Sequence, residues 1–164
     1  MNPLRLHPDD ARSWALWPTL EKRLRDFCLI YAQDTPYEPM LAHVRRLFAT
    51  TPDLLGAWVV LDDADETSIL AHCLSWVDVY WGEPYILIHQ LRGDKPQRWS
   101  TYKRHMLHEL FMWARALNEQ YQASGSLHRI RQFRFLTERP DEWQAYLRTQ
   151  AHRSLTMFTI PVEV

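Results

Sequence analysis

The chain has 164 residues, of which 46% are hydrophobic, 24% charged and 13% aromatic, a composition typical of one globular domain rather than of a disordered segment. Its net charge of −1 gives no positive field to attract nucleic acid, so we expect no nucleic-acid partner. No apolar run approaches the roughly 20 residues that cross a bilayer, and we expect no membrane partner.

The cysteines and the N-terminal residues indicate the compartment. Cys28 and Cys73 lie far apart and match no metal-binding or redox spacing, so we expect buried thiols in a reducing compartment. Residues 1–10 lack the apolar core of a signal peptide. The reduced thiols and the missing signal peptide together predict a cytoplasmic protein.

His105 and His108 are three residues apart, but without a third ligand nearby we expect a solvated helix face and no metal.

The N-terminal part predicts a short strand followed by helices. Leu4-Arg5-Leu6 alternates like an edge strand, and His7-Pro8-Asp9-Asp10 opens a helix with acids in its first turn. Pro18 suits a fresh helix start, after which apolar residues recur at helical spacing to Tyr31. A further helix is predicted over 39–48.

Three strands are expected next, over 55–61, 68–80 and 85–91, with turns at 62–65 and 82–84. The second and third strands are apolar on both faces, which predicts a central position covered on both sides. Their order along the chain predicts an antiparallel meander.

The C-terminal part predicts a long helix, a strand, a short helix and a last strand. Ser100 is a plausible N-cap for the long helix. Its apolar stripe comprises Tyr102, Met106, Leu110, Trp113 and Leu117. A strand over 129–136, a helix opening at Pro140 and a strand over 155–162 follow. Arg129, Arg131 and Arg134 crowd the first of these strands, as charges do on an edge strand that must avoid pairing.

This order of elements predicts an α/β fold in one domain over residues 1–164: a mixed, mostly antiparallel central sheet with helices on both faces. The order resembles the GCN5-related N-acetyltransferase (GNAT) fold of the acyl-CoA N-acyltransferase superfamily. Residues 4–11 are similar to the family's opening strand and helix start, residues 86–91 to its fourth strand, and residues 141–147 to a late helix bearing a tyrosine.

The resemblance implies a set of site residues and acetyl-CoA as a co-substrate. The backbone of His89, Gln90 and Leu91 would pair with the pantetheine arm. Tyr146 would act as the general acid on the departing thiolate. The superfamily's general base is a carboxylate or a water chain on the central strands, and Asp78 and Glu83 are the nearest acids. The alternative is that both acids flank a turn in solvent.

Two histidines on the predicted strands are further candidates for proton transfer. His72 and His89 could shuttle protons near neutral pH. A histidine on a buried strand is more often a hydrogen-bonded member of the core.

The coenzyme loop departs from the family pattern. That pattern is Arg or Gln, two residues, Gly, one residue, then Gly or Ala, and residues 97–102 are its nearest register. Ser100 and Tyr102 stand at the small positions, where glycines let the backbone approach phosphate. Tyr102 would crowd the coenzyme unless it points into the core, which its place in the apolar stripe allows. The polar residues that would contact the coenzyme here are Arg98, Ser100, Thr101 and Lys103. The basic residues at this helix start could equally form an exposed rim balanced by nearby acids.

Two functional hypotheses follow. The missing glycines predict a catalytically degenerate GNAT-like protein that serves as a binding or structural component, with a protein partner or self-assembly. A softer resemblance to phage-encoded GNAT-like proteins suggests a tailed bacteriophage particle, with the protein in the host cytoplasm or the virion. The alternative is an active N-acetyltransferase that moves an acetyl group from acetyl-CoA to a primary amine.

Overall fold

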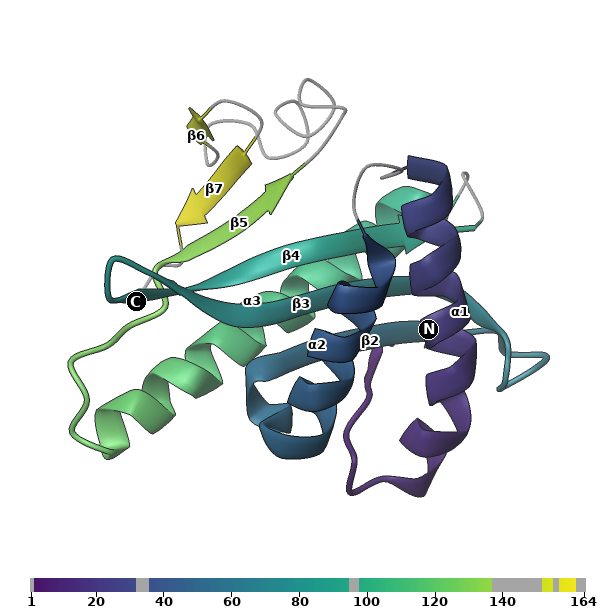
Figure 1. Ribbon diagram of the computed structural model, residues 1–164, viewed down its shortest axis with the longest axis horizontal. Coiled ribbons are helices and arrows are strands. Elements are labelled where there is room, and N and C mark those ends of the chain that lie inside the picture. The colour runs from purple at the N-terminus through teal and green to yellow at the C-terminus, as the bar shows by residue number, and fades with distance from the viewer. Residues whose placement is uncertain (1, 32–35, 95–97, 137–151, 155–156, 162–164) are drawn as a thin grey trace. The chain divides into compact units, whose positions relative to one another are not determined.

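The computed structural model describes residues 2–31, 36–94, 98–136, 152–154 and 157–161 (Figure 1). They form two compact units, the first from the described residues within 1–74 and 90–106 and the second from those within 75–89 and 107–164. The first contains β1 (Leu4–Arg5), α1 (Ala11–Tyr31), α2 (Tyr37–Thr50), the short 3-10 helix η1 (Pro52–Leu54) and β2 (Leu55–Leu61). The second contains β5 (Gln132–Leu136), β6 (His152–Ser154) and β7 (Met157–Pro161), while β3 (Ile69–Tyr80), β4 (Glu83–Gly93) and α3 (Trp99–Ala123) contribute to both. That residues 1–164 form one domain stays a prediction.

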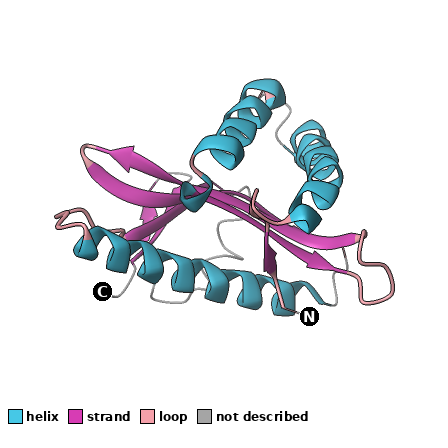
Figure 2. Ribbon diagram, turned by 90° about the horizontal axis from the view of Figure 1, so that it is seen from below, coloured by secondary structure: helices cyan, strands magenta, loops and turns pink. Residues whose placement is uncertain are grey.

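The sheet of the first unit has the strand order β1-β2-β3-β4. β1 pairs antiparallel with β2, Leu4 opposite Val59 and Arg5 opposite Trp58, as predicted for an edge strand. Residues 55–60 of β2 and 69–74 of β3 are all buried. Strands are buried on both faces only where both faces are covered. α1 and α2 lie on one face of this sheet and the first turns of α3 on the other (Figure 2). The mixed, mostly antiparallel α/β fold is thus confirmed.

α1 is one continuous helix, so the prediction of a fresh helix start at Pro18 is wrong. Proline removes the hydrogen bond to the carbonyl four residues earlier, here that of Trp14. Pro18 is exposed and Trp14 is 52% exposed, so this carbonyl lies on the solvent side, where water can replace the lost bond. The opposite face is held in the core by Leu16, Leu20, Leu24 and Cys28, each at most 2% exposed.

α1 and α2 are joined by stacked rings and by an ion pair. The rings of Trp17 and Phe48 stack with 4.0 Å between centroids. Arg45 donates two hydrogen bonds of 2.6 Å to the Glu21 carboxylate, which also accepts one of 2.7 Å from Trp17 Nε1. The hydrogen bonds from Arg45 outweigh the effect of burial and hold the pKa of Glu21 below its usual value.

We expect E21Q to reduce the free energy of unfolding by about 1–2 kcal/mol at neutral pH, because it removes a charge-assisted pair from a carboxyl that is 15% exposed. A lowered native pKa stabilises the fold above the unfolded pKa of roughly 4.3 and loses this effect as pH falls. Urea denaturation should therefore show the two proteins converging in acid. E66Q is the control, since Glu66 is 77% exposed and such pairs contribute little. Equal losses in both variants would contradict the prediction.

In the second unit the strand order is β3-β4-β5-β7-β6. β4 and β5 are parallel, as expected for strands joined through α3, whereas β5 with β7 and β6 with β7 are antiparallel. β5 is therefore an interior strand, and the prediction of an arginine-guarded edge is wrong. Arg129 and Arg131 precede the strand, and the Arg134 guanidinium lies over the Tyr85 ring, 4.4 Å from its centroid. β6 was not predicted, and the predicted helix at Pro140 lies outside the described residues.

The β3–β4 hairpin turns one residue earlier than predicted. Its two connecting residues, Trp81 and Gly82, have φ values of 53° and 80°, which is the type I′ arrangement that fits strand twist. Glu83 and Pro84 belong to β4. β4 is also less buried than predicted: Ile86, Ile88 and Gln90 are buried, but the alternate residues are only half-buried. The hairpin is the tightest antiparallel connection in the predicted meander.

α3 carries the predicted apolar stripe, and its members from Tyr102 to Leu117 are all buried. In the second unit its Asn118 side chain donates to the Ile130 carbonyl at 3.0 Å and accepts from the Ile130 amide at 2.6 Å. This pair fixes the chain that leads into β5. Within the described residues, no helix is both long and apolar enough to cross a membrane.

Candidate functional site

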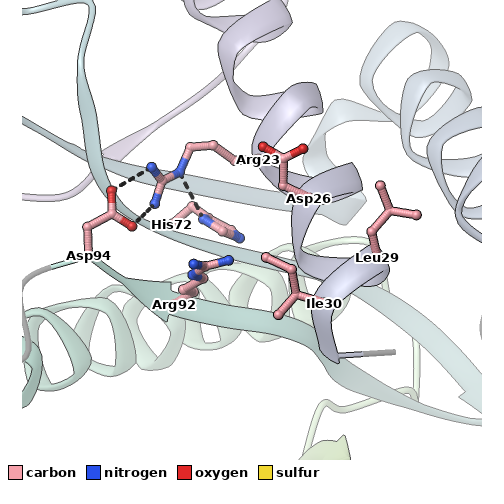
Figure 3. A pocket seen from close by; sticks show the side chains of 7 residues that line it. All are labelled: Arg23, Asp26, Leu29, Ile30, His72, Arg92 and Asp94. Carbon is pink, nitrogen blue, oxygen red and sulfur yellow. Dashed lines mark hydrogen bonds and ion pairs between the residues drawn. The ribbon is translucent and has the colours of Figure 1, made fainter. Parts of the chain in front are cut away.

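The first unit holds a pocket of about 260 Å³ between α1 and the ends of β3 and β4 (Figure 3). Charged and apolar side chains line it together, namely Arg23, Asp26, Leu29, Ile30, His72, Arg92 and Asp94. In Figure 3, Arg23 and Asp26 lie above His72 in the view, Asp94 lies to its left and Arg92 below it. The pocket is continuous with a line of buried polar groups that leads into the core.

Arg23 organises the polar side of this pocket. Its two terminal nitrogens donate to the two carboxylate oxygens of Asp94, both at 2.7 Å, and its Nε donates to His72 Nδ1 at 3.4 Å. Burial opposes ionisation of Asp94, but the Arg23 hydrogen bonds and the Arg23 and Arg92 charges outweigh it, so the pKa of Asp94 is lowered. Asp94 is thus held as an anion at neutral pH.

His72 is a fully buried neutral imidazole. Burial, together with the Arg23 charge, lowers the pKa of His72 to about 3. Because an arginine can only donate, Nδ1 is the acceptor, and Nε2 carries the proton and donates to Gln90 Oε1 at 3.2 Å. Both ring nitrogens are therefore engaged. The interpretation of His72 as a hydrogen-bonded core histidine is confirmed, and a proton shuttle at neutral pH is not supported.

Gln90 connects His72 to α1 through hydrogen bonds. Its Nε2 donates to the Leu24 carbonyl and to Cys28 Sγ, each at 3.4 Å. Burial raises the pKa of the Cys28 thiol, so this group is also neutral. Asp94, Arg23, His72, Gln90 and Cys28 thus form one polar network whose groups can bind and orient a ligand but have little capacity for proton transfer.

The predicted coenzyme residues on β4 have different surroundings. Gln90 is buried and its side chain is hydrogen-bonded within the network, so only its backbone could contact a coenzyme. His89 is half-buried in the second unit and stacks on Trp76 with 5.1 Å between ring centroids. Leu91 is half-buried. Their role in coenzyme binding stays a prediction.

The predicted coenzyme residues of α3 lie in its first turns. The helix begins at Trp99, so Ser100 lies inside the first turn and not at the N-cap, which corrects the prediction. Arg98, Ser100 and Thr101 are exposed and Lys103 is half-buried. Tyr102 is 2% exposed, with its side chain in the core. Contact of these residues with a coenzyme also stays a prediction.

The predicted catalytic residues lie elsewhere. Asp78 and Glu83 belong to the β3–β4 hairpin of the second unit, where Glu83 is exposed. Asp78 is half-buried and accepts a hydrogen bond of 3.1 Å from the Tyr85 hydroxyl. Burial, reinforced by Asp78, raises the pKa of Tyr85. Tyr146 lies outside the described residues, so its role stays a prediction. No cluster of potential metal ligands occurs among the residues that the structure describes.

Sequence reasoning did not select Arg23, Arg92 or Asp94. The Arg23–Asp94 pair joins residues 71 positions apart, and neither belongs to a motif. The available signal was a charged pair, Arg92 and Asp94, directly after a buried strand, which marks the place where binding groups often lie in α/β folds.

No protein-family model and no curated protein sequence matches the chain. Solved structures do. NAA60 of Arabidopsis thaliana in complex with a bisubstrate analogue has a TM-score of 0.58 and 11% identity, over 98% of both chains. A probable acetyltransferase has a TM-score of 0.56 and 10% identity, over 100% of this chain and 99% of the other. The NatC complex bound to Gag peptide and CoA has a TM-score of 0.55 and 10% identity, over 99% of this chain and 100% of the other. At such identities the likeness concerns the fold: this chain has the GNAT fold, that of acetyltransferases.

Proposed function

We propose that this GNAT-fold protein does not transfer acetyl groups efficiently and acts as a binding or structural component. The observation that carries the proposal is that neither small position of the coenzyme motif holds a glycine: Ser100 stands at the first and Tyr102 at the second. Small residues there let a backbone approach phosphate closely. Ser100 is exposed at this helix start, whereas the Tyr102 side chain lies in the core. Its buried hydroxyl has no hydrogen-bond partner among the described residues.

The chemistry of the described side chains also supports this proposal. His72 is neutral with both nitrogens engaged, and Asp94 is held by Arg23. Asp78 accepts the Tyr85 hydroxyl. A general base must accept a proton from the substrate. These groups are instead committed to contacts within the protein.

An exposed apolar group at the β3–β4 hairpin supports a role in binding a protein. Val79, Tyr80 and Trp81 are 60%, 55% and 87% exposed. Aromatic side chains are enriched at protein interfaces, and Trp81 adopts a positive φ that a large side chain rarely takes. The partner is another protein or a second copy of this chain. The softer resemblance of the sequence to phage-encoded GNAT-like proteins suggests a tailed-phage particle as the setting, in the host cytoplasm or the virion.

An active N-acetyltransferase is the second candidate, and the start of α3 favours it. Ser100 and Thr101 are exposed there, and the first turn holds no acid, as an anion-binding helix start requires. Among the described residues, β4 pairs with β5 from Ile86 to Ile88 and then continues beyond this ladder to Gly93. In this candidate acetyl-CoA is the co-substrate, Tyr146 the general acid and Asp78 or Glu83 the base.

Thermal unfolding with and without acetyl-CoA separates the two candidates. We expect acetyl-CoA to leave the wild-type melting temperature unchanged. A protein that binds acetyl-CoA would gain about 2.7 kcal/mol of stability at a hundredfold excess over Kd. The S100G/Y102A variant restores two small residues and should acquire a shift that CoA competes away. M106A is the control, because Met106 is fully buried one turn later on the same helix and its truncation also leaves a cavity.

Two outcomes would overturn the proposal. A wild-type shift that CoA competes away, with turnover that Y146F slows, would establish the acetyltransferase. An equal response of M106A and S100G/Y102A would show that the missing small residues are not the obstacle.

A further inference from the structure

We propose that the tip of the β3–β4 hairpin binds a second copy of this chain, so that the protein forms a weak twofold dimer through Val79, Tyr80 and Trp81. The proposal rests on the binding role already proposed for this hairpin and names its partner. All the residues that carry it belong to the second unit.

The hairpin tip exposes a large apolar side chain at a backbone position that does not favour one. Val79, Tyr80 and Trp81 are 60%, 55% and 87% exposed. Trp81 has a φ of 53°, and the first connecting residue of a type I′ turn is preferably asparagine or glycine, which adopt positive φ more readily. Tryptophan therefore stabilises this turn less than asparagine would. Strain of this kind at an exposed residue indicates a function for its side chain.

The rings at the tip are held in place by contacts within the second unit. The Gln132 side chain accepts two hydrogen bonds from Arg134, of 3.2 Å and 3.0 Å. The Arg134 guanidinium lies over the Tyr80 ring, 5.0 Å from its centroid. The Tyr80 and Trp81 rings in turn meet edge to face, with 6.0 Å between centroids. Side chains that are already fixed lose little entropy when a partner binds.

The charges around the tip are compatible with a second copy as the partner. Asp78 lies near the end of β3 and Glu83 begins β4. Arg134 lies over Tyr80, and Arg131 directly precedes β5, which runs parallel to β4 and so begins at the same end of the sheet. Two carboxylates and two guanidiniums thus border the apolar tip and balance one another.

This balance matters because a twofold contact brings the same patch of both copies face to face. A patch with a net charge would repel its own copy, whereas a neutral patch that carries both signs can place each sign opposite the other. An apolar centre with a charged border is also the usual anatomy of a protein interface. The net charge of −1 of the whole chain adds little repulsion between the copies.

Sedimentation equilibrium of the full-length protein tests the proposal. The concentrations extend to about 500 µM, because a contact smaller than roughly 800 Å² per partner gives weak association. We expect wild type to form a reversible dimer and W81N to stay monomeric. L127N is the matched control, because Leu127 is 95% exposed in the same unit but outside the hairpin; this variant should dimerise as wild type does.

Urea denaturation at a concentration where wild type is monomeric separates lost association from lost folding. Asparagine before Gly82 suits the type I′ turn, so W81N should have a higher urea midpoint than wild type while it fails to dimerise. A lower midpoint would contradict the strain assigned to Trp81.

The remaining outcomes distinguish the other possible partners. Wild type that stays monomeric at every concentration would overturn the second copy as partner. A dimer that persists in W81N, or that L127N weakens equally, would place the interface elsewhere, and oligomers larger than a dimer would overturn the twofold contact. Binding to phosphatidylcholine vesicles that W81N abolishes would assign the tip to a lipid surface. A wild-type melting shift with acetyl-CoA, in a protein that still dimerises through Trp81, would overturn the proposed function alone.

Discussion

Replacing Gln90 with methionine should lower the free energy of unfolding by about 2 kcal/mol, although the new side chain is apolar and similar in size. Gln90 is 2% exposed and accepts from His72 Nε2 at 3.2 Å. Its loss leaves the buried N–H of His72 without an acceptor, which costs about 1–3 kcal/mol. Urea denaturation followed by tryptophan fluorescence measures the change. Q132M is the control, because Gln132 is half-buried and its side chain accepts hydrogen bonds from Arg134, two residues along the same strand.

The double variant H72L/Q90M distinguishes a polar contact from simple packing. H72L alone leaves Gln90 Oε1 without its donor, and Q90M alone leaves the imidazole N–H without its acceptor. Removing both partners removes both unsatisfied groups, so the double variant should lose about 1–2 kcal/mol less than the sum of the single losses. Arg23 is 19% exposed, and water can replace the bond that its Nε makes to His72. Strict additivity would mean that the hydrogen bond contributes nothing beyond volume.

The regular elements were predictable wherever side-chain period alone decides them. β2 has the predicted bounds of 55–61, and the stripe from Tyr102 to Leu117 is buried as expected. Pro18 misled the prediction because local rules end a helix there, whereas burial of Leu20 and Leu24 on the opposite face holds it together. The turn of the β3–β4 hairpin was predicted one residue too late because Trp81 has a positive φ, which a bulky residue rarely adopts.

The candidate site was less predictable because it depends on tertiary contacts. Gln90 was selected for its backbone, but its side chain forms the contact between β4 and α1. Arg23 has the spacing of an ordinary exposed helix residue, and only the folded chain brings it to Asp94. Sequence periodicity places a residue on a face, whereas ion pairs between distant segments require the arrangement of the elements.

Among the described polar residues of the second unit, Asn118 should be the most sensitive to substitution. It is 8% exposed, and its amide group satisfies both the N–H and the carbonyl of Ile130, a residue that is fully buried. N118L leaves both backbone groups unsatisfied and should cost about 2–4 kcal/mol. Hydrogen exchange at the Ile130 amide should accelerate along with this loss, because that N–H then has no acceptor.

N118D should cause a similar loss at pH 7, but one that depends on pH. The introduced carboxylate still accepts from the Ile130 amide, but its second oxygen faces the Ile130 carbonyl, where an oxygen without a proton is repelled. Burial and this repulsion raise the native pKa of the new carboxyl above the unfolded value of roughly 3.9. The native state then binds the proton more tightly, so the penalty shrinks as pH falls through the raised pKa. Relative to wild type, N118D should regain stability between pH 7 and 4.5 in urea denaturation, whereas N118L should not; parallel pH profiles of the two variants would contradict this role of Asn118.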